Sequence, residues 1–353
     1  MRLLVLPGDG IGPEITAATL AVLLAVQARA GFTLDIDEDV VGQESLRRHG
    51  TTVRPALLNK ARKSDGLILG PAATFDFHDP EKGEINPSMF FRKRLDLYAN
   101  IRPARTYDGL SQKLGPFDLV IARENTEGFY ADRNMAEGNA EMLVTEDVAI
   151  SLRRVTRAAC KRIARAAFEL ASGRKKHVTA VHKANVLKLG DGMFLDECRK
   201  CARDFPGIAV DELIVDAAMA HLVRNPAQFD VIVTTNMFGD IISDLTAEAS
   251  GSIGLGGSLN AGADYAMAQA AHGSAPDIAV KNLANPFSLI LSAALLLAWH
   301  GRRKAEPAFV KAAVAIEQGV EGAIAAGEIT RDIGGRLGTR EAGAALAARL
   351  QRA

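Results

Sequence analysis

The chain has 353 residues, of which 48% are apolar and 24% charged, and this composition is ordinary for a soluble globular protein of two domains. Its 42 basic and 42 acidic residues give a formal net charge of zero, so the overall charge does not indicate binding to nucleic acid or to an anionic membrane. Three cysteines favour a reducing compartment, and the longest apolar segment, residues 287–299, is shorter than a membrane span, so we expect a cytoplasmic protein.

The predicted elements alternate between short apolar strands and amphipathic helices along most of the chain. We predict strands at 3–6, 33–39, 66–69, 119–122, 177–182, 212–215 and 231–233. We predict helices at 14–28, 54–63, 89–98, 148–171, 192–204 and from Asp240 onward, then a loop-rich stretch at 261–286 followed by alanine-rich helices. This alternation predicts an α/β fold with a largely parallel sheet. Because no stretch has the composition of a linker, the two domains should share a sheet or exchange segments.

The stretch FDVIVTTNMFGDIISD, residues 229–244, predicts a buried strand, a tight turn and a helix that carries two aspartates. Asp240 and Asp244 are four residues apart, so they lie on one face of that helix. Two like charges at this spacing cost about 0.2–0.5 kcal/mol unless a positive charge lies between them. The pair suits Mg²⁺ or Mn²⁺, although an N-cap at Asp240 and a solvated Asp244 would explain the same pattern.

Three arginines form a candidate cluster: Arg92 lies in the predicted helix 89–98, Arg102 just after it, and Arg123 at the end of the predicted strand 119–122. An arginine at the end of an apolar strand needs an anionic partner. Planar guanidinium groups bind carboxylates with two hydrogen bonds, so a converging set indicates a polycarboxylate ligand. A structural ion-pair network with Asp96 or Glu124 is the alternative.

Three further segments are candidates for ligand contacts. Lys183 and Asn185 directly follow the predicted strand 177–182, where a lysine is either a proton carrier or a surface cation. The segment HGSAPDIAVKNLANP, 272–286, is long enough to wrap a ligand. The turn GDGIGPE has two glycines of a dinucleotide fingerprint but proline at the third position, so it is not a Rossmann motif.

Together, GDGIGPE, RKRLDLYANIRP, RENTEGFY, HKANVLK, VDAAMAHLV, NMFGDIISD and HGSAPDIA with LANP resemble the isocitrate/isopropylmalate dehydrogenase family of metal-dependent β-decarboxylating dehydrogenases. The motifs occur in the family's order between residues 7 and 286. The resemblance implies a two-domain isopropylmalate-dehydrogenase-like fold with a largely parallel sheet shared across the domains, not a classical Rossmann fold. Residues 1–99 plus 250–353 would form the cofactor-binding domain. Residues 100–249 would form the central domain, with the interface of a homodimer or higher oligomer.

The resemblance also implies a role for each matching residue. The expected catalytic groups are Tyr130, which protonates the enolate, and Lys183, which relays a proton in the partner subunit's site. The expected substrate contacts are Asn86, Ser88, Arg92, Arg102, Arg123 and Asn185. Mg²⁺ or Mn²⁺ would bind Asp240 and Asp244 together with Asp216 from the other subunit. The expected cofactor contacts are Ile11, His272, Gly273, Ser274, Ala275, Pro276, Asp277, Ile278 and Asn285.

The implied reaction is the oxidative decarboxylation of a 3-substituted malate with NAD⁺. Asp277 favours NAD⁺ because its carboxylate would bind ribose hydroxyls and repel a 2′-phosphate. Asn86 and Ser88 favour isocitrate as substrate, whereas Met89 and Phe90 would suit the apolar group of 3-isopropylmalate. Tartrate, D-malate or homoisocitrate are further alternatives, and a non-catalytic regulatory subunit is the alternative from a different class. Residues 70–77, GPAATFDF, depart from the family's expected Thr-Pro or Gly-Gly-Pro turn.

Overall fold

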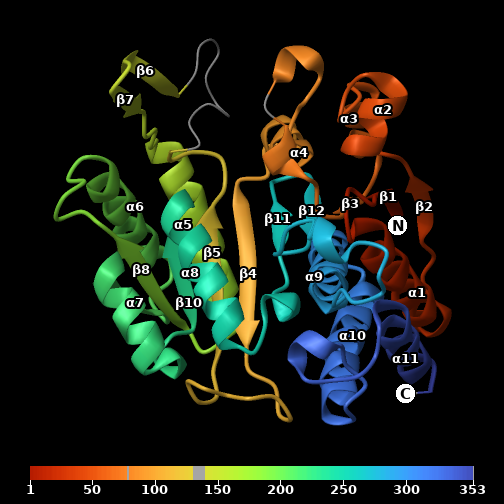
Figure 1. Ribbon diagram of the computed structural model, residues 1–353. Helices are drawn as coiled ribbons and strands as arrows, with labels where there is room; N and C mark the ends of the chain where they lie inside the picture. Colours follow the sequence, from red (N-terminus) through yellow and green to blue (C-terminus); the bar gives the residue numbers. More distant parts are fainter. Residues whose placement is uncertain (78, 130–139, 353) are drawn as a thin grey trace.

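A single ten-stranded sheet runs through the chain in the computed structural model, which describes residues 1–77, 79–129 and 140–352 (Figure 1). In order across the sheet, the strands are β2 (Asp35–Glu38), β1 (Arg2–Leu6), β3 (Gly66–Leu69), β12 (Ala266–Gln269), β11 (Leu259–Ala261), β4 (Ala99–Arg105), β5 (Asp118–Glu124), β10 (Val231–Thr234), β8 (His177–His182) and β9 (Ala209–Ile214).

The sheet consists of two parallel halves that run in opposite directions. Strands β2, β1, β3 and β12 are mutually parallel, and so are β5, β10, β8 and β9. Antiparallel pairings of β11 with β12 and β4, and of β4 with β5, join the halves. The predicted α/β fold with a largely parallel, shared sheet is confirmed, and its mixed centre distinguishes it from a classical Rossmann fold. The domain boundaries stay a prediction.

Helices cover both faces of the sheet because the strands are apolar on both sides. On one face, side chains of four helices join the strands in one large core: α1 (Gly12–Ala30), α5 (Arg157–Ser172), α9 (Phe287–Lys304) and α10 (Pro307–Ala325). Helices α6 (Gly190–Asp204) and α11 (Thr339–Arg352) pack into the same core. On the other face lie α3 (Ala56–Lys63), α4 (Pro87–Arg94), α7 (Val215–Arg224) and α8 (Asn236–Ala249). A further short helix, α2, spans Gln43–His49. None of the helices in the described ranges is long and apolar enough to cross a membrane.

Two predicted helix starts are wrong. The helix predicted at 148–171 begins only at Arg157, where the Thr156 side chain caps it by accepting a hydrogen bond from the Ala159 N–H at 3.3 Å. The residues before it form the second strand of a hairpin, β6 (Glu141–Thr145) and β7 (Val148–Ser151), which projects from the body (Figure 1). Helix α8 begins at Asn236, so Asp240 lies in its second turn and is not an N-cap.

The sequence did not predict β4, β11, β12, α2 or α7. Strand β4 contains Asn100, Arg102 and Pro103, which are unusual in a buried strand. Strands β11 and β12 span three and four residues inside the stretch predicted as loop, too few for a period to show. These short strands matter here because the candidate site lies where they end.

Candidate active site

Arg123 links the end of β5 to the first turns of α8. Its Nε donates to the backbone oxygen of Asn236 at 2.9 Å, its Nη2 donates to the Asn236 Oδ1 at 2.7 Å, and its Nη1 forms an ion pair with Asp240. Residue 239, in the first turn of α8, must be small, because a Cβ on Gly239 would lie 2.6 Å from the Arg123 Cγ. The guanidinium is buried with all three nitrogens bonded, which satisfies the requirement that a buried charge be paired.

Arg102, on the neighbouring strand β4, lies between the two aspartates of α8. Its Nη1 donates to the Asp244 Oδ1 at 2.9 Å and to the Ser243 Oγ at 2.7 Å, and its Nη2 is 3.5 Å from the Asp240 Oδ1. Burial raises the pKa of Asp244 and the charge of Asp240 adds to this, while Arg102 acts in the opposite direction. The positive charge that the spacing of the aspartates required is therefore supplied by the chain itself.

Arg92, on α4, approaches the same place from the other half of the sheet. Its Nη2 donates to the Gln269 Oε1 at 2.9 Å, and the Ser88 hydroxyl donates to the same oxygen at 3.0 Å. Asn86 caps α4, because its Oδ1 accepts a hydrogen bond from the Met89 N–H at 3.1 Å. The sequence did not indicate Gln269, because it ends β12, a strand that lies inside the stretch predicted as loop.

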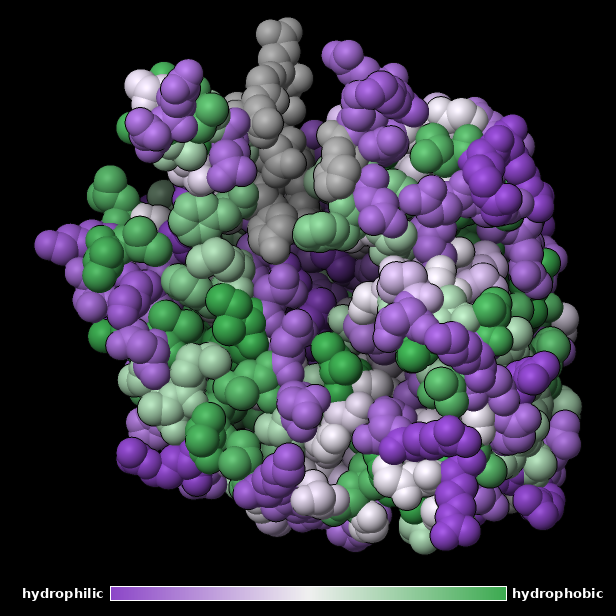
Figure 2. Space-filling model, in the orientation of Figure 1, coloured by the Kyte–Doolittle hydropathy of each residue, from purple (hydrophilic) through white to green (hydrophobic). Residues whose placement is uncertain are grey.

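These residues surround one cavity of about 250 Å³, lined by Pro71, Ala72, Thr74, Asn86, Ser88, Met89, Arg92, Arg102, Arg123, Asp240, Gln269, Ala270, Ala271, His272 and Gly273. Figure 2 shows a hydrophilic hollow between the two halves of the molecule. The alternative partners of the arginines are not used: Asp96 pairs with Arg162 at 2.8 Å, and Glu124 accepts hydrogen bonds from Thr126 and Glu127. The three arginines and Asp240 thus converge on one cavity suited to a small polycarboxylate.

Lys183 and Asp216 lie elsewhere in the chain. Lys183 follows β8, Asp216 stands in the first turn of α7, and the two side chains form an ion pair with each other. Neither lines the cavity, and neither does Asn185. The roles of Lys183 and Asp216 in a second copy's site, and of Asn185 as a substrate contact, stay predictions. Tyr130 lies outside the described residues.

A buried ion pair, missed from the sequence, connects the Lys183 turn to α8. The Lys183 backbone N–H donates to the Asp191 Oδ2 at 2.6 Å, and the Asp191 Oδ1 is 2.6 Å from the Arg153 Nη2. Arg153 also donates to the hydroxyl of Thr235, the residue before α8, at 3.1 Å. The position of the lysine is therefore tied to the helix that carries Asp240.

A divalent metal fits part of this site. In the described part of the chain, no group of three His, Cys, Asp or Glu residues is arranged to hold a metal ion. Asp240 and Asp244 nevertheless present carboxylates from consecutive turns, and hard oxygen donors of this kind are what Mg²⁺ and Mn²⁺ prefer. One chain supplies two of the three predicted ligands, and the third would have to come from another copy.

The predicted cofactor loop packs against the turn after β1. The Ile11 N–H donates to the Ser274 backbone oxygen at 2.9 Å, and a Cβ on Gly10 would lie only 1.9 Å from that oxygen. Burial lowers the pKa of His272, which favours its neutral form, and its buried Nε2 has no hydrogen-bond partner in the described part of the chain. That orphaned ring nitrogen, at the edge of the substrate cavity, is consistent with a ligand such as NAD⁺ in this loop.

Two other predicted cofactor residues differ in their surroundings. Asp277 is exposed on the loop, and the Lys281 Nζ donates to its backbone oxygen at 2.7 Å. Asn285 is buried and serves the fold: its Oδ1 accepts from the Phe287 N–H at 3.0 Å, and its Nδ2 donates to the Asp332 Oδ2 at 3.0 Å. A cofactor contact from Asn285 would have to coexist with both bonds.

Residues 70–77, whose sequence differs from the turn expected for the family, line the cavity through residues 71, 72 and 74. Asp9, buried in the turn after β1, holds it by accepting a hydrogen bond from the Ala73 N–H at 2.9 Å, and it accepts another from the Gln43 N–H at 2.8 Å. Burial raises the pKa of Asp9, and these backbone bonds act against the rise. Despite its unusual sequence, this segment is therefore held in a defined position beside the predicted nicotinamide region.

Comparisons with known proteins agree with this geometry over the whole chain. The family described as isocitrate/isopropylmalate dehydrogenase matches residues 2–346. A 3-isopropylmalate dehydrogenase from Archaeoglobus fulgidus is 40% identical over 344 residues, 96% of each chain. An isocitrate/homoisocitrate dehydrogenase from Thermus thermophilus is 40% identical over 335 residues, 95% of this chain and 94% of that one. The solved isocitrate dehydrogenase from Methylococcus capsulatus superposes with a TM-score of 0.87 at 37% identity, covering 99% of both chains. The chain belongs to the isocitrate/isopropylmalate dehydrogenase family.

Proposed function

We propose that this protein uses NAD⁺ and Mg²⁺ or Mn²⁺ to decarboxylate a 3-substituted malate oxidatively, as a homodimer. The observation that carries the proposal is the convergence of Arg92, Arg102, Arg123 and Asp240 on one cavity. Three guanidinium groups around a small cavity suit the two carboxylates of a malate. The complete set of charged residues argues against a non-catalytic regulatory subunit.

In this proposal, the arginines orient the malate so that its C2 hydroxyl faces the aspartates of α8. Lys183 of the partner subunit accepts the proton of that hydroxyl, and Tyr130 donates a proton to C3 after CO₂ has left. Bound NAD⁺ would serve as the acceptor of the hydride from C2, and a metal held by Asp240 and Asp244 would supply a Lewis acid.

The substrate that we favour is 3-isopropylmalate, with isocitrate as the second candidate. The isocitrate preference expected from the sequence rests on Asn86 and Ser88. However, the Ser88 hydroxyl donates its proton to Gln269. A serine oxygen that has donated its proton offers only lone pairs, which would repel a third carboxylate. Met89 lines the same cavity and suits an alkyl group. The name of the Archaeoglobus relative supports the same choice.

A substrate panel tests the proposal. The purified protein is assayed with NAD⁺ and Mg²⁺ or Mn²⁺ against 3-isopropylmalate, isocitrate, homoisocitrate, D-malate and tartrate, with product CO₂ measured beside NADH. We expect kcat/KM for 3-isopropylmalate to exceed that for isocitrate by at least about 10-fold, the effect of a single misplaced polar contact. A higher value for isocitrate would favour the second candidate. Absence of turnover with every malate would favour the regulatory subunit.

The surface supports a dimer. Val223 on α7 and Ile241 on α8 are each 53% exposed, and apolar residues gather on this side of the molecule (Figure 2). The hairpin β6–β7 also exposes Leu143, Val148 and Ile150. Exposed apolar surface of this kind marks protein interfaces. A second copy on this face would cover the helix that carries Asp216.

The three cysteines are buried free thiols, which supports the proposed cytoplasmic location.

A further inference from the structure

A larger cavity, of about 720 Å³, lies on the reverse side of the strands that carry the substrate arginines. Along β4, Ile101 and Arg105 line this cavity, whereas Arg102 lines the smaller one. Along β5, Val120 lines it and Arg123 lines the smaller one. Because successive strand residues point to opposite faces, the two cavities lie back to back across the sheet.

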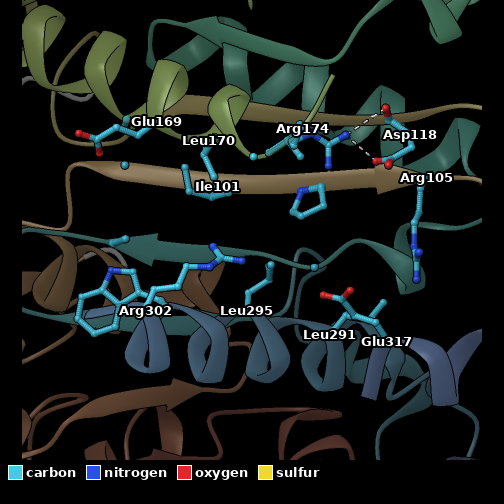
Figure 3. A pocket seen from close by; sticks show the side chains of 18 of the residues that line it. Ile101, Arg105, Asp118, Glu169, Leu170, Arg174, Leu291, Leu295, Arg302 and Glu317 are labelled. Carbon is cyan, nitrogen blue, oxygen red and sulfur yellow. Dashed lines mark hydrogen bonds and ion pairs between the residues drawn. The ribbon is translucent and has the colours of Figure 1, made fainter. Parts of the chain in front are cut away.

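The walls of the reverse cavity come from both halves of the molecule. Helix α5 contributes Leu170 on one side, and α9 contributes Leu291, Leu295 and Trp299 on the other (Figure 3). Together with Ile101 they make a broad apolar surface. Its volume lies within the range of small-molecule sites, about 300–1,000 Å³.

Most of the charges around this cavity are paired. Arg174 is 2.8 Å from both Asp118 and Asp230, and Arg105 is 2.6 Å from Glu321. These pairs need no ligand to compensate them.

Arg302 and Glu317 differ, because no hydrogen bond or ion pair joins either to another side chain in the described parts of the chain, although the charges of Arg105 and Arg302 act on Glu317 and Arg302 is itself exposed. Figure 3 shows both directed from α9 and α10 into the cavity. Burial raises the pKa of Glu317, and the charges of Arg105 and Arg302 counteract this rise. The cavity therefore presents one carboxylate and one guanidinium beside an apolar wall.

We propose that the reverse cavity binds a free α-amino acid with a large apolar side chain. The carboxylate of the amino acid pairs with Arg302, its ammonium pairs with Glu317, and its side chain packs against Ile101, Leu295 and Trp299. A simple anion would leave Glu317 unpaired and be repelled by it, and a simple amine would do the same to Arg302. A zwitterion offers a partner to both charges while burying an apolar group.

Binding is tested with L-phenylalanine and two analogues that each lack one charge, 3-phenylpropionate and 2-phenylethylamine. Calorimetric titration of the full-length protein should give saturable binding of phenylalanine, at least about 10-fold tighter than either analogue. Saturating 3-isopropylmalate should not displace it, because the two sites lie on opposite faces of the sheet. This readout does not depend on turnover, so it is independent of the proposed function.

Two charge variants, one control variant and one blocking variant locate the site. Glu317→Gln and Arg302→Gln should each weaken phenylalanine binding at least about 10-fold. Lys304→Gln, which removes an exposed cation from the same helix end, should leave it within about 2-fold. Ala166→Trp should block the cavity from α5 and abolish binding. No saturable binding, equal binding of phenylpropionate, or unchanged binding by both charge variants would overturn the proposal.

Discussion

Arg102 both stabilises the two aspartates of α8 and competes with any cation for them. It bonds to Asp244 at 2.9 Å and lies 3.5 Å from the Asp240 Oδ1. A metal would share these carboxylates with Arg102, and a malate carboxylate would offer the arginine another partner. At the scale of single residues, this geometry predicts that metal binds more tightly in the presence of substrate than in its absence.

The first prediction concerns Asp240. Replacement Asp240→Asn should abolish turnover and remove the stabilisation of the protein by Mn²⁺, because a neutral amide is a poor ligand for a hard cation. The fold should survive, since the Asn oxygen still accepts a hydrogen bond from Arg123. Steady-state assays and thermal unfolding with and without Mn²⁺ measure both effects. Full activity of the wild-type protein after exhaustive chelation would contradict the metal assignment.

The second prediction concerns Asp277 and cofactor choice. NAD⁺ should be preferred over NADP⁺ by at least ~10-fold in kcat/KM, because a like-charge clash with the 2′-phosphate should cost more than about 1.4 kcal/mol. Asp277→Lys combined with Ile278→Tyr should narrow or reverse the preference. Lys281→Ala is the control: its Nζ bonds to the Asp277 backbone oxygen, so the ratio should change by less than about 2-fold. Equal use of both cofactors by the wild type would refute the assignment.

At the scale of elements, the turn after β1 and the loop 272–278 form one unit. Gly10 has a φ of 58°, and its missing Cβ leaves room for the Ser274 backbone oxygen. Their contact joins segments that are more than 260 residues apart in sequence, and the loop carries most of the predicted cofactor contacts. Displacing the turn should therefore disturb the cofactor more than the malate.

The third prediction tests this unit. Gly10→Ala should raise KM for NAD⁺ at least about 10-fold and cost about 1–3 kcal/mol of stability, from the close contact and the positive φ. The KM for the malate should change less. Gly192→Ala in α6 is the matched control, because nothing lies within 4 Å of its added Cβ. An unchanged KM for NAD⁺ in Gly10→Ala would separate the loop from cofactor binding.

At the scale of the whole molecule, the single chain keeps Lys183 and Asp216 away from the cavity that the arginines line. They pair with each other beside the apolar surface of α7 and α8. A symmetric dimer formed through this surface would carry each lysine toward a neighbouring copy. An active site completed across an interface would make activity inseparable from assembly.

The fourth prediction follows from this arrangement. Lys183→Ala and Asp240→Asn should each be inactive alone, and an equal mixture that has exchanged subunits should recover about a quarter of wild-type activity. Half of the dimers are then mixed, and one of the two sites in each mixed dimer has every wild-type group. If Lys183 served its own chain, the mixture would stay inactive. A fully active monomer in sedimentation experiments would exclude the shared site.

The sequence predicted the elements that are buried from end to end. Strands β1, β3, β8 and β10 are short apolar runs, because helices cover both faces of a parallel sheet. Each of these strands can therefore be recognised from its own sequence alone. It failed at β4, whose polar residues find partners far away in sequence: Arg102 bonds to Asp244 on α8, and Asn100 bonds to Ser258 and Asn260. It also failed at the hairpin, where exposed apolar residues imitate the face of an amphipathic helix.

The sequence by itself determined the kinds of chemistry available: guanidinium groups, paired aspartates at helical spacing, a lysine after a strand and a glycine-rich loop. Only the tertiary structure decided which of these meet. Gln269 contacts Arg92 across 177 residues of chain, and Arg123 contacts Asp240 across 117. Such contacts depend on strand order and on which face each side chain occupies, and neither is encoded in local spacing. For the same reason, the cavity behind β4 could be recognised only after the sheet had been assembled.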